Sequence, residues 1–275
     1  MSCLLLAFLA VTFAYQALTR VLWLYEARVH GGITLSGPRL PYFTAFLADW
    51  CAFVFGLVAS VAAPLTRMRT RPRVPTTSRP VMVVGGGTAT SGAMALLVAR
   101  LRRDGREAHA CGYGRARGAH AKAGRVASAL RELAASTGAR RIDVITHGEA
   151  GVILRSAARD HGCLDVLGNV VSLGAPHRGA ALASFFGLRS LAHLRPGSRY
   201  LTSLADSDPV PEAVNFTAIA SSFDAAVFPP ELAYYAGAMN VTLDWVGHHA
   251  LLTSERIYRL AKENIDIEPK AAGNA

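Results

Sequence analysis

Glycines, histidines and cysteines are residue types that form phosphate, dinucleotide or metal sites when their spacing is right. The run GGGTATSG at residues 85–92 is similar in composition to a phosphate-binding loop. It lacks the Lys-Ser/Thr pair of a P-loop and the Gly-x-Gly-x-x-Gly spacing of a dinucleotide site. The four cysteines are scattered, and the clustered histidines show no metal-ligand spacing: His109, His120, His147, His161, His177 and His193. The sequence therefore predicts no metal site and no cofactor.

Five short blocks carry polar residues at the ends of apolar runs. In chain order they are IDVITHGEAG, SLGAPHRG, LRPGSRYLTSL, FTAIASSFD and VGHHALLTS. This ordered set resembles small bacterial lipases, the triacylglycerol lipase/esterase branch of the α/β-hydrolase fold. The resemblance covers about residues 79–262. It implies a mostly parallel central sheet with helices on both faces, and a catalytic triad in the chain order Ser, Asp, His.

The resemblance implies the acid and the base of such a triad. Asp224, in SSFDAAV, takes the position of the acid, and His248, in VGHHALLTS, takes that of the base. His249 is the alternative base, but the Gly-His-x-x-Leu spacing favours His248. A lone aspartate or histidine is usually structural, so the prediction depends on both residues matching their blocks.

The nucleophile position implied by the resemblance holds a glycine. The family's Gly-x-Ser-x-Gly turn corresponds here to Thr-His-Gly-Glu-Ala at residues 146–150, so Gly148 stands where the serine would be. The flanking glycines have become Thr146 and Ala150, and Gly85-Gly86 stand where the family has His-Gly. Several departures at once indicate relaxed constraint on chemistry rather than one isolated substitution.

The other parts of the site are expected to be backbone groups. Gly87 and Glu149 would supply the N–H groups of an oxyanion hole, and the Glu149 carboxylate would oppose a developing negative charge. Ser91 and Ser172 lie near strand ends, but neither is expected on an elbow-like turn. Without a serine, oxyanion stabilisation and binding leave a residual rate about 10³–10⁴ above water.

Alternating strand and helix patterns position these blocks. Short β-branched runs such as VMVV at residues 81–84 alternate with helical stretches such as residues 125–139, where apolar residues recur at helical spacing and Gly138 signals the end. Such alternation predicts a parallel sheet covered on both faces. Ser254 is a plausible N-cap of the last helix. Residues 180–213 interrupt the alternation and predict a helical, lid-like insertion.

The N-terminal residues 1–66 contain two long apolar stretches. Residues 3–19 carry no charge, and residues 42–65 are interrupted only by Asp49, which should face the partner helix or lie near a boundary. A membrane-anchoring helical hairpin is the favoured interpretation. A single span with an interfacial second helix, a pair of buried core helices and a cleaved signal peptide are the alternatives, and no basic residue precedes Arg20 as a signal would require.

Positive charge is concentrated between the apolar N-terminal residues 1–66 and the lipase-like domain that begins at residue 79. Residues 67–78 form a basic linker, and the five arginines between residues 67 and 79 make up half of the net charge of +10. Nucleic-acid binding is therefore not indicated. Basic residues beside a span stay on the cytoplasmic side and attract anionic lipids. The sequence predicts a bacterial inner-membrane protein with its lipase-like domain, residues 79–268, on the cytoplasmic face, followed by a tail at residues 269–275.

Two functions follow from these features. The favoured one is a membrane-anchored, lipase-like pseudoenzyme that retains a scaffold for a lipid or acyl-ester ligand and has a protein partner of unknown identity. The alternative is an active carboxylic-ester or lipid hydrolase in which His248, oriented by Asp224, activates water. A purely structural membrane protein is the third possibility.

Overall fold

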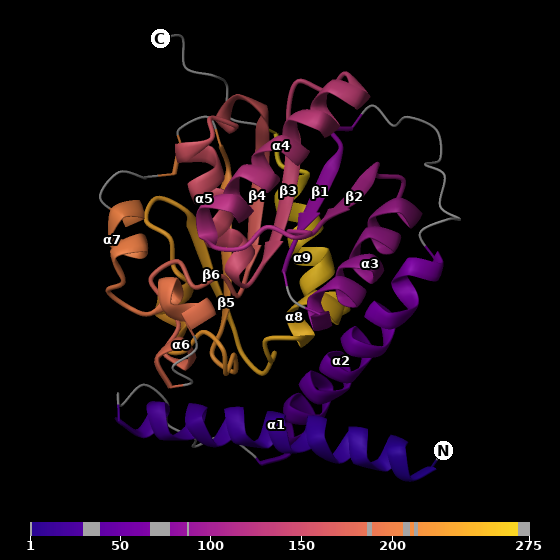
Figure 1. The fold of residues 1–275 in the computed structure, drawn as a ribbon, viewed down its shortest axis with the longest axis vertical. Coiled ribbons are helices and arrows are strands. Elements are labelled where there is room, and N and C mark those ends of the chain that lie inside the picture. The colour runs from indigo at the N-terminus through magenta and orange to yellow at the C-terminus, as the bar shows by residue number, and fades with distance from the viewer. Residues whose placement is uncertain are drawn as a thin grey trace.

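The computed structural model describes residues 2–29, 39–66, 78–86, 88–185, 189–205, 210–211 and 214–268. Within these residues, six strands form a single sheet in the order β2-β1-β3-β4-β5-β6 (Figure 1). Every neighbouring pair is parallel. The strands are β1 (Val81–Val84), β2 (Ala108–Cys111), β3 (Ile142–His147), β4 (Leu167–Leu173), β5 (Phe216–Ser221) and β6 (Met239–Leu243).

Helices connect the strands and cover both faces of the sheet. The longer ones are α3 (Thr88–Arg103), α4 (Ala119–Thr137), α5 (Glu149–Asp160) and α9 (Glu255–Ile265). Strand side chains alternate between two cores, because successive residues of a strand point to opposite faces. Met82 and Val84 pack with α4 and α5, whereas Val81 and Val83 pack with α3 and α9. The predicted parallel sheet with helices on both faces is thus confirmed.

Local sequence signals predicted where helices end more accurately than where they begin. Gly138 follows α4 in the left-handed conformation (φ 68°), as the predicted stop requires. Ser254 caps α9, and its side chain accepts a hydrogen bond from the Ile257 N–H. However, α4 begins at Ala119, six residues before the predicted start, because no capping side chain marks its N-terminus.

Within the insertion at residues 180–213, the described residues form short helical elements on one flank of the sheet. They are α6 (Leu182–Phe185), η2 (Arg189–Leu194) and α7 (Arg199–Ala205). Their apolar side chains, including Leu194, Leu201 and Leu204, pack with Val152 of α5. The predicted helical character is confirmed, while a lid function stays a prediction. Further short elements are η1 (Leu164–Val166), η3 (Pro230–Ala233) and α8 (Ala250–Thr253).

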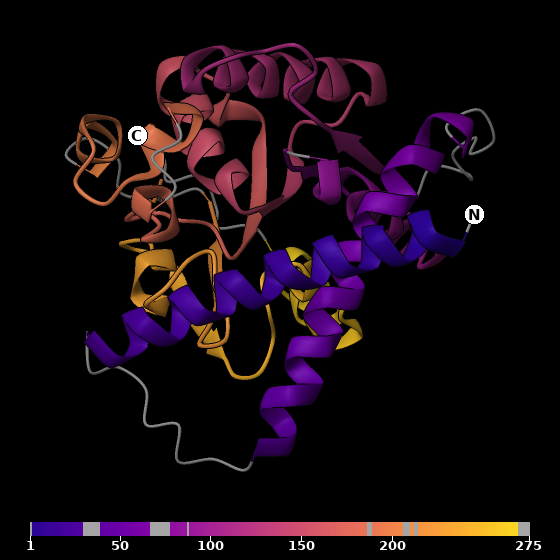
Figure 2. The same cartoon turned by 60° about the horizontal axis from the view of Figure 1, so that its bottom comes forward.

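Two long apolar helices precede the sheet. We call α1 (Ser2–Val29) and α2 (Arg39–Thr66) the N-terminal helix pair. Both contain stretches long and apolar enough to cross a membrane, Cys3–Val29 and Pro41–Val61. Figure 2 shows that the helices cross at an angle, and that α2 continues alongside α3. Most of the proposed linker and the tail lie outside the described residues, so the predicted domain boundaries stay predictions.

Candidate active site

The sharp turn between β3 and α5 holds Gly148. Its backbone has φ 56° and ψ −131°, a conformation that strains any residue with a side chain. The turn follows β3 at its carboxyl end. The order of the strands reverses between β3 and the neighbouring β1, and open parallel sheets bind their ligands at such a reversal. The sequence-predicted elbow is therefore an actual sharp strand-to-helix turn.

Asp224 and His248 form a hydrogen-bonded pair in the loops that follow β5 and β6. The His248 Nδ1 lies 2.8 Å from the Asp224 Oδ2, and the two side chains are 16% and 1% exposed. A carboxylate only accepts hydrogen bonds, so Nδ1 carries the proton and Nε2 presents its lone pair. The Asp224 Oδ1 accepts two further hydrogen bonds, from the N–H groups of Ala226 and Val227. The acid is thereby held in one orientation.

The histidine faces the elbow. A Cβ atom built on Gly148 would lie 3.4 Å from the His248 Nε2 and 3.6 Å from its Cε1. The structure thus brings together the three predicted triad positions, Gly148, Asp224 and His248. A hydroxyl at residue 148 would be within reach of the histidine lone pair, which is the geometry by which a histidine activates a serine.

Electrostatics favour the ion pair. Burial opposes charge on both groups, but the negative charge of Asp224 and its hydrogen bond raise the pKa of His248 above its ordinary value. The charge of His248, together with hydrogen bonds from the imidazole and two backbone N–H groups, lowers the pKa of Asp224 in spite of burial. The pair is therefore arranged to stabilise an imidazolium, as a general base needs after it takes a proton.

Solved structures with the same architecture belong to lipases and esterases. The mature lipase BlEst2 of Bacillus licheniformis superposes with a TM-score of 0.62 over 72% of this chain and 96% of its own, at 17% identity. The chain has the α/β-hydrolase fold. Lipase B of Aspergillus fumigatus gives a TM-score of 0.57 over 72% of this chain and 56% of its own, at 14% identity. Est1E of Butyrivibrio proteoclasticus gives 0.51 over 71% and 92%, at 14% identity.

No family model matches the sequence, and no curated protein matches it either. At these identities the likeness to solved structures establishes the α/β-hydrolase fold and no activity.

The predicted oxyanion side of the elbow contains a carboxylate whose charge is compensated. Glu149 is the first residue of α5, so its N–H has no partner within the helix. Its carboxylate accepts hydrogen bonds from the Lys122 Nζ at 2.7 and 2.9 Å and pairs with the His193 Nε2 at 2.7 Å. Burial opposes this charge, but His193 and Lys122 lower the pKa of Glu149. The negative charge expected to oppose an oxyanion is therefore offset by Lys122. Gly87 lies outside the described residues.

His147 is a site residue that sequence reasoning dismissed with the other histidines. Its Nε2 lies 2.9 Å from the backbone oxygen of His248, and the two rings are 4.5 Å apart. Burial and the neighbouring His248 lower the pKa of His147 to about 3. The ring is therefore neutral, and because a carbonyl only accepts, its Nε2–H is the donor. Its place immediately before the elbow was the one available signal.

The N-terminal helix pair contacts both site loops, which the sequence did not predict. The Arg20 Nη1 donates to the Phe223 oxygen at 2.8 Å, next to Asp224, and the guanidinium lies 3.7 Å from the Phe223 ring centre. The Asp49 Oδ1 accepts the N–H groups of His249 and Ala250 at 2.8 and 3.0 Å, next to His248.

Asp49 faces the partner helix, as predicted. Its Oδ2 accepts a hydrogen bond from the Gln16 Nε2 at 3.4 Å and lies 3.8 Å from the Arg20 Nη2. Asp49 thus connects α1, α2 and the loop that carries His248.

The alternative residues do not take up catalytic positions. The His249 ring packs against Phe53, and burial lowers its pKa to about 4. Ser91 lies within α3, and Ser172 lies within β4 and hydrogen-bonds to the buried His177 at 3.0 Å. Neither serine is on an elbow turn, as predicted. Among the described residues, no three His, Cys, Asp or Glu side chains are grouped to hold a metal ion.

Taken together, the predicted site holds a base whose neutral ring presents a lone pair, an orienting acid and the N-terminus of α5, but a hydrogen atom in place of the nucleophile. Such a site is able to bind an ester carbonyl and to accept a proton. It has no side chain at residue 148 with which to form an acyl-enzyme.

Proposed function

We propose that this chain is a membrane-associated, lipase-like pseudoenzyme that binds a lipid or acyl ester in its hydrolase site without forming an acyl-enzyme. One observation supports this proposal most: Gly148 adopts the elbow conformation directly beneath a hydrogen-bonded Asp224–His248 pair. The nucleophile is missing from an otherwise ordered site. The two apolar helices support membrane association, and the arginines after α2 support the cytoplasmic face, because the lipids of that leaflet are anionic.

The first experiment is ester hydrolysis by the full 275-residue chain, reconstituted with lipid and compared with His248→Ala. We expect no turnover of short- or long-chain acyl esters that depends on His248. Turnover that His248→Ala abolishes would overturn the pseudoenzyme assignment.

Ligand binding is tested separately with a photo-crosslinking fatty-acyl ester. We expect crosslinked peptides that contain residues 146–151 or residues 247–252, because these segments border the site. Crosslinks confined to α1 and α2 would show that the chain only contacts bulk lipid, and the proposed acyl-binding scaffold would be wrong.

A second candidate function, direct hydrolysis by water, is favoured by the open side of His248. Within 4 Å, a Cβ at Gly148 meets atoms of His248 alone. A water molecule there would give a proton to Nε2 while its oxygen attacks the ester carbon. Collapse of the tetrahedral intermediate would then expel the alkoxide, which takes the proton back from Nε2. Turnover that His248→Ala abolishes, with no acyl-enzyme formed, distinguishes this route.

A further inference from the structure

The N-terminal helix pair has an inner face that the hydrolase domain covers. Five residues of α1 at helical spacing are 2–4% exposed: Gln16, Thr19, Arg20, Trp23 and Ala27. Among them, Trp23 makes edge contacts with Phe223 and Phe228. One side of α1 therefore rests on the loops at the carboxyl ends of the strands, and α1 lies across the bottom of Figure 1.

The opposite side of α1 is apolar and open. Leu4, Val11, Leu18 and Tyr25 follow one another at intervals of seven residues and are 79%, 68%, 49% and 57% exposed. Seven residues are close to two helical turns, so the four side chains share one face. Among the exposed residues of α1, the only charged one is Arg28, in its last turn.

Helix α2 is fixed to the domain in a similar way. The Ser60 Oγ accepts the Gly92 N–H of α3 at 2.8 Å and donates to the Gly56 oxygen at 2.7 Å. The helices approach so closely that a Cβ at Gly92 would lie 2.5 Å from the Gly56 oxygen. The exposed positions of α2 between Phe43 and Val61 are all uncharged.

These contacts oppose a bilayer crossing. From Leu4 to Tyr25, α1 is about 31 Å long, which is close to the thickness of a hydrocarbon core. If α1 crossed, its contacts with Phe223 and Phe228 would bring polar site loops into lipid. Helix α2 would bring α3 with it through Ser60. The unsatisfied backbone groups of those loops would be costly there.

We propose that α1 lies in the plane of an anionic lipid interface, with the carboxyl edge of the sheet directed toward the membrane and α2 rising from this interface alongside α3. This inference rests on the membrane association proposed above. An uncharged helix face of this length fits the boundary between headgroups and acyl chains. The arginines at positions 67, 69, 71 and 73 follow α2 in the sequence and complement anionic headgroups.

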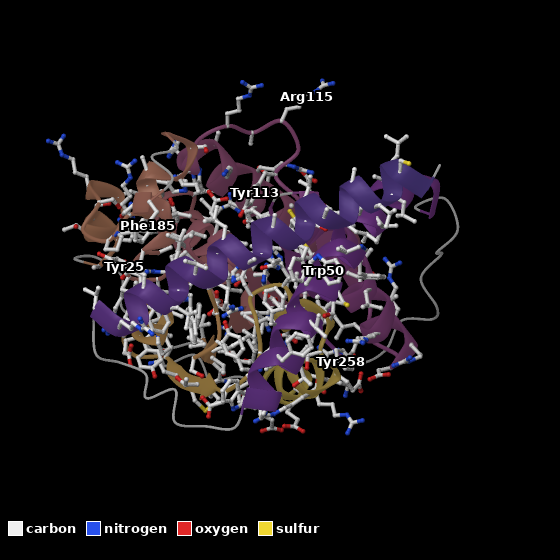
Figure 3. The ribbon with its side chains drawn as sticks, turned by 90° about the horizontal axis from the view of Figure 1, so that it is seen from below. Tyr25, Trp50, Tyr113, Arg115, Phe185 and Tyr258 are labelled. Atoms are coloured by element: carbon white, nitrogen blue, oxygen red, sulfur yellow. The ribbon has the colours of Figure 1, made fainter. Side chains whose placement is uncertain are left out.

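Aromatic side chains continue this face beyond α1. Figure 3, seen from below, shows α1 crossing the face with Tyr25 beside Phe185. Phe185 is 43% exposed, and Trp245, which contacts Phe223, is 39% exposed. Aromatic rings favour the membrane–water interface. In this arrangement the loop that carries Asp224 lies next to the membrane, because Arg20 of α1 hydrogen-bonds to the Phe223 oxygen.

The test measures the depth of four positions along α1 in the full chain. Cys3 and Cys51 are exposed and are replaced by serine, whereas Cys111 and Cys163 are buried and are kept. Single cysteines at residues 4, 11, 18 and 25 carry a spin label. Collision with oxygen and with a nickel chelate then reports the depth of each label in vesicles of phosphatidylcholine and phosphatidylglycerol.

We expect one shallow depth at all four positions. A profile with residues 11 and 18 near the bilayer centre, and residues 4 and 25 at opposite surfaces, would establish a crossing and overturn the inference while leaving membrane association intact. Labels that remain in water, or that broaden one another in a protein dimer, would overturn both the inference and the proposed membrane association.

A charge variant provides a matched test. Val11→Asp with Leu18→Asp is expected to reduce flotation with vesicles roughly 10- to 100-fold, because two apolar contacts with lipid are lost. Leu164→Asp, at an exposed position remote from this face, is expected to leave flotation unchanged. Equal flotation of the two variants would contradict an in-plane α1. In detergent, we expect the variant Val11→Asp with Leu18→Asp to crosslink the acyl ester near residue 148 as the unchanged chain does. Loss of flotation with unchanged crosslinking separates the membrane inference from the proposed ligand binding.

Discussion

Replacing Gly148 by serine tests whether the site retains the geometry of a triad. The backbone at Gly148 has φ 56°, so any side chain there is strained by about 1–3 kcal/mol. The new Cβ would lie 3.4 Å from the His248 Nε2, an ordinary contact that adds no clash. At about 2–4 °C per kcal/mol for a chain of this size, we expect the melting temperature to fall by roughly 2–12 °C.

The expected gain in chemistry is large. Loss of the serine alone from a serine protease triad lowers kcat about 10⁶-fold. The same factor is therefore the upper bound on the gain in kcat when a serine is placed beside the Asp224–His248 pair. The Oγ must come within about 2.6–3.2 Å of Nε2 to be activated. Because the Glu149 N–H and the compensated carboxylate are already in place, we expect an increase of at least about 10³ in ester hydrolysis.

The assay is the release of nitrophenolate from nitrophenyl esters by the full chain, which retains the helices that hold the site loops. Gly148→Ser should give a burst of one equivalent per chain. Gly148→Ala is the matched control, since it has the same backbone strain and no hydroxyl. It should lower the melting temperature equally and release nothing. A folded serine variant without a burst would refute the assignment of Asp224 and His248 as triad positions.

Four further outcomes are expected. Asp49→Ala should destabilise the fold by about 3–5 kcal/mol in urea unfolding, because it removes a buried ion-pair partner and the acceptor of two loop N–H groups; an effect below 1 kcal/mol would contradict its structural role. In the serine variant, kcat should rise with pH through a pKa above that of free histidine, and Asp224→Asn should lower that pKa in an NMR titration. The stability from the His248–Asp224 pair should be greatest between about pH 4 and 6.5, since the raised histidine pKa makes it fade at higher pH and the lowered aspartate pKa makes it fade in acid. Lys122→Met in the serine variant should lower kcat about 10- to 100-fold, and adding Glu149→Gln should restore it, because the uncompensated carboxylate opposes the oxyanion; no restoration would refute that explanation.

Much of the hydrolase fold was predictable because the signals are local. The three β-branched valines at residues 81, 83 and 84 form, with Met82, a buried strand whichever helices cover them, and Gly138 ends α4 because it adopts a left-handed backbone. The start of α4 was not predictable, since no capping side chain marks it. The two long apolar segments were recognised as helices, but their composition did not show what they would pack against.

The site divides in the same way. The sequence by itself determined that residue 148 has no nucleophile, and ordered blocks were enough to select Asp224 and His248. Only the tertiary structure decided that the histidine lone pair faces Gly148, that Lys122 offsets Glu149, and that Arg20 and Asp49 hold the two site loops. The hydrogen bond between Asp49 and the His249 N–H joins two residues that are 200 positions apart in the sequence. A contact between residues so distant depends on how the helices pack against the sheet, and neither composition nor periodicity encodes that packing.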